Sequence, residues 1–149
     1  MRRLFLLLAC ALPLMAACDS SPTAATVEDT DFAPALGVDL DAMTRLDGGL
    51  YIRDLTVGTG AVVQPGQSIT AKYKGWLSNG TLFTDAQSPF RVGVGSLIRG
   101  WDVGIPGMRV GGKRQLVIPP SMAYGAQGRA PSIPGNAVLV FEVEVLSAQ

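Results

Sequence analysis

The residues best suited to chemistry in this chain are aromatic, and they lie far apart in the sequence. Trp101, Tyr124 and Phe141 each sit in a short run bounded by apolar residues or glycine, while histidine is absent and cysteine occurs only at Cys10 and Cys18. Nucleophilic triads and His/Cys metal centres need residues that this region does not contain. What remains is the chemistry of an apolar aromatic pocket that carries a few polar groups.

Rotation about the peptide bond before proline is a reaction that needs no nucleophile, no proton transfer and no cofactor. Its barrier is ~18–20 kcal/mol because amide resonance is lost, and the uncatalysed exchange takes roughly 10–100 s. The twisted amide has a less polar carbonyl than the planar one, so a dry aromatic pocket binds it better than the ground state. One or two hydrogen-bond donors that orient the carbonyl would complete such a site.

The elements that must position these residues are mostly strands. Alternating apolar residues predict strands near 69–74 and 139–145, with Glu142 and Glu144 on the wet face of the second. Asn79-Gly80 predicts a hairpin turn, 113–118 a further strand, and 97–105 one short helix ended by Gly104 and Pro106. The predicted fold class is α+β, a curved antiparallel β-sheet wrapped on one short α-helix.

The N-terminus has the pattern of an export signal, predicted over residues 1–17. Arg2 and Arg3 precede an apolar run that is shorter than the ~20 residues of a membrane span. Met15-Ala16-Ala17-Cys18 resembles a bacterial lipoprotein box, which predicts a lipid on Cys18. Plain cleavage that leaves a free thiol is the alternative. Lipidation predicts a protein anchored to a bacterial membrane of the cell envelope, facing the periplasm or the exterior.

Residues 18–45 are rich in Ser, Thr, Ala, Pro and Asp, which predicts a flexible tether with at most one short helical turn, at Asp39. The globular domain is predicted over 46–149. The chain has 12 basic and 12 acidic residues, so no basic surface suggests a nucleic-acid partner. A monomer is the default expectation.

From about Gly49 to Leu146 the sequence resembles the FKBP-type peptidyl-prolyl cis-trans isomerases. The motifs that carry the resemblance are Arg99-Gly100-Trp101 and Ala123-Tyr124-Gly125, together with their order and spacing. The resemblance implies a catalytic site in which the Tyr124 hydroxyl and the Ile98 backbone N–H orient the substrate carbonyl. It also implies a substrate-binding wall made of Tyr73, Phe83, Phe90, Leu97, Ile98, Trp101, Tyr124, Ile133 and Phe141.

The chain departs from the family pattern after Phe83. Family members usually have an aspartate there, where this chain has Thr84, with Asp85 one position later. That aspartate orients the tyrosine hydroxyl, so Asp85 is included as a third candidate catalytic residue, acting through a local shift. The segment from Phe83 to Phe90 is also shorter than in small single-domain members.

Three functions follow from these patterns. The first is a lipid-anchored isomerase acting on proline-containing segments of exported proteins, open to rapamycin-type macrolides and needing neither metal nor cofactor. The second is a tethered proline-recognition or chaperone module with little turnover, which Thr84 favours. The third is an envelope spacer. Each aromatic residue taken alone is also explained as core packing, so the joint pattern decides.

Overall fold

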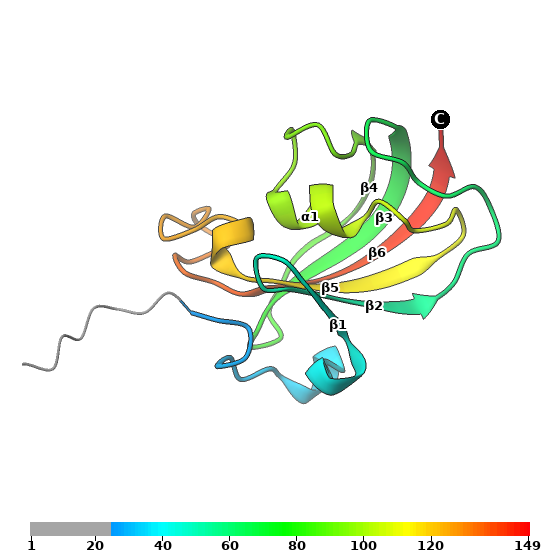
Figure 1. Ribbon diagram of the computed structural model, residues 1–149. Helices are drawn as coiled ribbons and strands as arrows, with labels where there is room; N and C mark the ends of the chain where they lie inside the picture. Colours follow the sequence, from blue (N-terminus) through cyan, green and yellow to red (C-terminus); the bar gives the residue numbers. More distant parts are fainter. Residues whose placement is uncertain (1–24) are drawn as a thin grey trace, which may run out of the picture.

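The computed structural model describes residues 25–149, and the sequence predictions for the signal peptide and for Cys18 lie outside the described residues. A six-stranded sheet in the order β1-β2-β5-β6-β3-β4 forms the frame, and all neighbouring strands are antiparallel (Figure 1). The strands are β1 (Thr44–Leu46), β2 (Leu50–Thr56), β3 (Ser68–Leu77), β4 (Leu82–Arg91), β5 (Lys113–Ile118) and β6 (Leu139–Ala148). The helices are α1 (Arg99–Gly104) and the 3₁₀ turns η1 (Pro34–Leu36), η2 (Leu40–Ala42) and η3 (Pro120–Met122).

The hairpin predicted at Asn79-Gly80 joins β3 to β4. Gly80 has φ of +89°, a conformation that glycine adopts at little cost, and its N–H donates to the Leu77 carbonyl at 2.9 Å. The Asn79 side-chain oxygen accepts a hydrogen bond from the Thr81 N–H at 3.0 Å. These contacts reverse the chain and bring Tyr73 of β3 and Phe83 and Phe90 of β4 to one face of the sheet.

The main core lies between the sheet and α1, and it confirms the predicted fold class. Leu139, Phe141, Val143 and Val145 of β6 all belong to this core, as their alternation with Glu142 and Glu144 predicted. The helix approaches the sheet closely because its glycines face β5: a Cβ on Gly100 would lie 2.5 Å from Ile118. The sequence therefore predicted both the sheet and the helix that packs against it across this core.

The other face of the sheet is covered by the segment before β1, which differs from the sequence prediction. Val27 and Leu36 are buried there with Tyr51, Val117 and Val140 of the sheet, and the buried Gln115 amide donates to the Leu36 carbonyl at 2.8 Å. The flexible tether predicted over 18–45 therefore does not hold for residues 25–45. Figure 1 shows η1 and η2 packed below the sheet, opposite α1. The segment is ordered because β5 and β6 present apolar side chains on both faces.

A polar cluster of Glu28, Arg45 and Tyr51 fastens this segment to β1 and β2. The Glu28 carboxylate accepts hydrogen bonds from Arg45 Nε at 3.0 Å and from the Tyr51 hydroxyl at 2.9 Å. Its own backbone N–H and these two side chains hold the pKa of Glu28 below its ordinary value. The same hydrogen bond to Glu28 raises the pKa of Tyr51. The ionised carboxylate is thus the form that the folded protein prefers.

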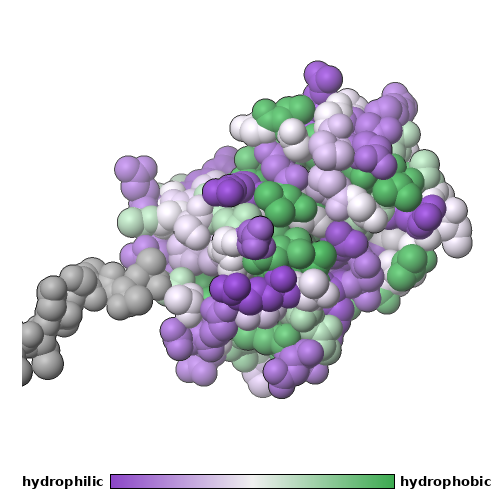
Figure 2. All heavy atoms as spheres, in the orientation of Figure 1, coloured by the Kyte–Doolittle hydropathy of each residue, from purple (hydrophilic) through white to green (hydrophobic). Residues whose placement is uncertain are grey.

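The surface mixes hydrophobic and hydrophilic side chains. On the face seen in Figure 2, hydrophobic side chains gather near the middle with hydrophilic ones around them. No helix formed by residues 25–149 has both the length and the apolar character of a membrane span.

Candidate functional site

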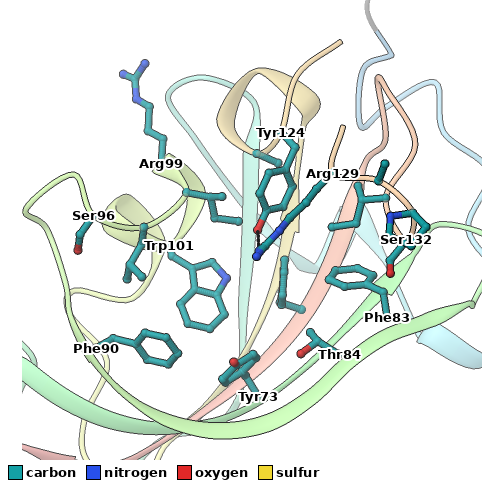
Figure 3. Close-up of a pocket in the computed structure, with 17 residues that line it drawn as sticks. Tyr73, Phe83, Thr84, Phe90, Ser96, Arg99, Trp101, Tyr124, Arg129 and Ser132 are labelled. Carbon is teal, nitrogen blue, oxygen red and sulfur yellow. Dashed lines mark hydrogen bonds between the residues drawn. The ribbon is translucent and has the colours of Figure 1, made fainter. Parts of the chain in front are cut away.

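A cavity of about 890 Å³ opens between α1, the curled strands β3, β4 and β6, and the loop after η3 (Figure 3). Its floor is Trp101, the third residue of α1. The Trp101 N–H donates to the Ile98 carbonyl at 2.9 Å, and its carbonyl accepts from the Ile105 N–H at 3.0 Å, so the single turn of helix fixes the indole position. Trp101 is only 4% exposed. The Trp101 side chain therefore belongs to the hydrophobic core and also lines the cavity.

Aromatic rings surround the Trp101 indole in edge-to-face contact. Its ring centroid lies 5.0 Å from Tyr73, 5.2 Å from Phe90 and 5.4 Å from Phe141, with interplanar angles between 78° and 86°. Phe83 extends the cluster by packing on Phe141 at 5.5 Å. Edge-to-face pairs of this kind hold each other in fixed orientations. The result is a rigid aromatic cup rather than a loose apolar patch.

Gly75 of β3 makes this cup possible, and the sequence analysis did not identify it. A Cβ at Gly75 would lie 2.6 Å from Phe141 and 2.7 Å from Phe83, too close for either ring to keep its place. A glycine within a strand often marks a close approach of other groups. That rule was the available signal, because Gly75 directly follows the strand predicted near 69–74 and comes two residues after Tyr73.

Tyr124 and Ile133 come from one tightly bonded loop. The backbone groups of Arg129 and Ile133 exchange two hydrogen bonds, of 2.8 and 2.9 Å, and the Gly128 N–H donates to the Tyr124 carbonyl at 3.1 Å. The Asn136 N–H closes the base of the loop on the Gly125 carbonyl at 2.8 Å. The loop thus presents the Tyr124 ring to the cavity from the side opposite Phe90 (Figure 3).

Two hydrogen-bond donors on residues that line the cavity, the Tyr124 hydroxyl and the Ile98 N–H, have bonding capacity to spare. The Tyr124 hydroxyl accepts a long hydrogen bond of 3.4 Å from Arg129, so its own proton is free to be donated. The Ile98 N–H, just before α1, finds no acceptor among residues 25–149. The Trp101 Nε1 also has no partner within the described chain, but it is buried from solvent and is therefore not a donor exposed to the cavity. A bound carbonyl would satisfy donors that the protein leaves open.

The structure brings the predicted site residues together around this cavity, with one exception. The lining includes Tyr73, Phe83, Phe90, Leu97, Ile98, Trp101, Tyr124, Ile133 and Phe141. Asp85 does not line it. The Asp85 carboxylate pairs with Lys74 at 3.2 Å, both side chains nearly half exposed, and Thr84 lines the cavity in its place.

The position of Asp85 corrects the sequence prediction and has a simple geometric cause. Lys74 and Asp85 are opposite each other in the β3–β4 register, one residue along from the inward-facing Tyr73. Successive strand residues point to opposite faces of a sheet, so this pair faces away from the cavity. The register shifts between Gly75 and Trp76, which places both Phe83 and Thr84 on the cavity side. The register shift therefore brings Thr84, and not Asp85, to the cavity.

The lining carries no acidic side chain, and residues 25–149 bring together no group of three or more His, Cys, Asp or Glu residues suited to a metal ion. The arrangement suits a ligand that needs aromatic enclosure of a ring and hydrogen bonds to a carbonyl. Acid–base chemistry by a carboxylate pair has no residues here to perform it.

A comparison with protein-family models matches residues 60–146 to the model described as FKBP-type peptidyl-prolyl cis-trans isomerase. The chain is 50% identical over 104 residues to an FK506-binding protein of Neisseria meningitidis serogroup B, covering 66% of this chain and 95% of that one. It is 46% identical over 109 residues to FK506-binding protein 4 of Dictyostelium discoideum, covering 71% of this chain but only 30% of that longer protein.

Among solved structures, the chain resembles a peptidyl-prolyl cis-trans isomerase from Pseudomonas syringae pv. tomato, with a TM-score of 0.67 and 33% identity. That match covers 72% of this chain and 81% of the other. Most of this chain thus shares its fold with an experimentally determined structure.

Proposed function

Because the chain belongs to the family of FKBP-type peptidyl-prolyl cis-trans isomerases, we propose that it catalyses rotation about X-Pro bonds within the aromatic cup. The observation that carries the proposal is the pairing of a rigid ring of aromatic side chains with open hydrogen-bond donors at its edge. The proline ring would rest on Trp101, between Tyr73, Phe90 and Phe141. Phe83, Leu97 and Ile133 would bound the rest of the peptide.

The reaction follows from differential binding. In the planar amide the carbonyl is polarised and well solvated, whereas the twisted amide has lost resonance and favours apolar surroundings. The Tyr124 hydroxyl and the Ile98 N–H would hold a substrate carbonyl in one orientation while the bond rotates. Because the aromatic walls are already fixed by their mutual packing, the cup does not reorganise during rotation.

The test is a prolyl isomerisation assay of a short X-Pro peptide with the purified protein, with and without FK506, the ligand named for the relatives. We expect acceleration that FK506 abolishes. A folded protein that leaves the uncatalysed rate unchanged would contradict the proposal.

A second candidate function rests on Thr84. The family usually has an aspartate at this place, and here a neutral side chain lines the cavity while Asp85 faces outward. A proline-recognition module with little turnover is therefore the alternative. Tight binding of proline peptides or FK506 without acceleration would favour it, and failure to bind either would point to a structural spacer.

We further propose that the substrates are exported proteins and that the chain is anchored to an envelope membrane through Cys18. The support is the sequence Met15-Ala16-Ala17-Cys18 after an apolar run. Exported chains fold after crossing a membrane, when slow prolyl exchange limits the rate. Mass spectrometry of the N-terminal peptide tests this: a diacylglycerol on Cys18 is expected, and Cys18→Ser should release the protein from membranes. An unmodified Cys18 would contradict the anchor.

A further inference from the structure

The mouth of the cavity carries positive charge that no acidic residue among residues 25–149 balances. Arg99 and Arg129 both line the cavity, and neither forms an ion pair within residues 25–149. The acidic residues Asp85 and Asp102, which lie near Arg99 in the sequence, bind other partners. Asp85 pairs with Lys74, and Asp102 accepts the N–H groups of Gly93 and Gly95 at 2.7 and 2.8 Å.

Of the two arginines, Arg129 is the one directed at the site. Its Nη1 lies 3.4 Å from the Tyr124 hydroxyl and its guanidinium lies 5.8 Å from the Tyr124 ring centroid. Figure 3 shows this side chain reaching across the cavity toward the tyrosine, while the Arg99 side chain extends away from Trp101. The guanidinium of Arg129 therefore stands beside the group that would hold the substrate carbonyl.

A guanidinium in this position has donors to spare. It has five N–H donors, and the contact to the Tyr124 hydroxyl uses one of them at long range. The planar fork of an arginine matches the two oxygens of a carboxylate. Because the residue before proline supplies the carbonyl that Tyr124 would hold, the side chain of that residue would lie near the Arg129 guanidinium.

We propose that Arg129 makes the site selective for X-Pro segments in which the residue before proline is acidic, an inference that rests on the proposed isomerase function. The carboxylate of X would bind the Arg129 guanidinium while the proline ring enters the cup. Thr84 helps by its neutrality, because a carboxylate lining the cavity would compete for the same arginine. A lysine before proline would meet like charge instead.

The experiment compares kcat/KM for matched peptides that differ only in Glu, Gln or Lys before proline. For an exposed charge pair, we expect Glu to exceed its isostere Gln by about two- to fivefold, with Lys lowest. Raising the ionic strength should shrink the difference. In Arg129→Gln the Glu/Gln ratio should fall to one. Lys72→Gln removes the same charge from an exposed position that does not line the cavity, and it should keep the full ratio.

The ratio of kcat/KM for the Glu and Gln peptides tests the selectivity separately from the isomerase activity itself. If all peptides are accelerated but Glu and Gln are equal, or if Arg129→Gln keeps the ratio, the selectivity is overturned while the isomerase stands. If no peptide is accelerated, the isomerase proposal fails, and titration calorimetry of the same peptides then decides the selectivity. Tighter binding of the Glu peptide, lost in Arg129→Gln, supports it, and equal binding rejects it.

Discussion

Tyr124 carries the hydroxyl on which the orientation of the substrate carbonyl depends. Tyr124→Phe removes that donor and keeps the ring, so we expect kcat/KM to fall about three- to tenfold, the worth of one neutral hydrogen bond. The assay is isomerisation of an X-Pro peptide. Tyr51→Phe is the matched control, because its hydroxyl contacts Glu28 on the far side of the sheet. Equal losses in both variants would refute the role of Tyr124.

A substitution at Gly75 tests whether ligand binding requires the aromatic rings of the cup to keep their positions. In Gly75→Ala the added Cβ displaces the rings of Phe83 and Phe141, and overpacking of this kind costs about 1–3 kcal/mol of stability. FK506 should bind more weakly as well. Gly37→Ala, at φ of +59° with open space around it, loses stability through backbone strain alone and should keep its affinity. Thermal unfolding and calorimetry measure both quantities. Unchanged affinity in Gly75→Ala would contradict the argument.

The sequence predicted most of these residues because aromatic types and motif spacing carry their roles. It did not predict which face Asp85 occupies. The face of the sheet to which a β4 side chain points depends on the register of β3 against β4. The register shift after Gly75 is a property of the paired strands and cannot be read from either strand alone. The same limit explains why Gly75 was missed: its neighbour Phe141 is distant in sequence.

At the scale of elements, Arg114 joins the helix to the sheet. Its Nη1 donates to the carbonyl of Gly104 at the end of α1 at 2.8 Å, and Nε and Nη2 bind the Asp54 carboxylate at 2.7 and 3.0 Å. A cation at a helix C-terminus is also favoured by the helix dipole. The element that carries Trp101 is thus fixed to β5 and β2 by one side chain.

Arg114→Leu should therefore loosen α1. We expect a loss of about 2–3 kcal/mol in the free energy of unfolding, from charged hydrogen bonds and an unpaired Gly104 carbonyl. Denaturant unfolding measures that loss, and Trp101 fluorescence reports whether the floor has moved. Arg109→Leu is the control, because Arg109 donates to the Gly60 carbonyl away from the helix. A variant as stable as the control would show that packing alone holds α1.

Element boundaries were predictable where local chemistry fixes them. The strand at 113–118, the turn at Asn79-Gly80 and a helix ended by Gly104 and Pro106 all follow from short-range rules. The burial of Gln115 and Arg114 within β5 was not predictable in this way. Gln115 is buried because Leu36, a residue far away in sequence, covers it and accepts its hydrogen bond.

At the scale of the whole molecule, the sheet separates two layers with different tasks. One face holds α1 and the aromatic cup, and the other is closed by residues 25–43. The sequence predicted the layer with α1 and the aromatic cup, but it predicted a flexible tether in place of the second layer. The apolar residues of that second layer, Val27, Phe32 and Leu36, follow neither a helical nor a strand period. Only the apolar far side of β5 and β6 explains why they are buried.

The attachment of that second layer should depend on pH through Glu28. Its pKa is lowered in the folded protein from an ordinary 4.5, so its stabilising contribution is complete above that value and is lost as the pH falls below it. Glu28→Gln should therefore be less stable than the parent at pH 7, and the difference should vanish in acid, where both side chains are neutral. Denaturant unfolding across this pH range measures it. Asp41→Asn, which removes an exposed carboxylate without an ion pair within residues 25–149, is the control variant. Isomerisation at pH 7 should be the same in the parent and in Glu28→Gln, because the sheet stands between this cluster and the cup. A parallel loss of activity would mean that the two layers are coupled.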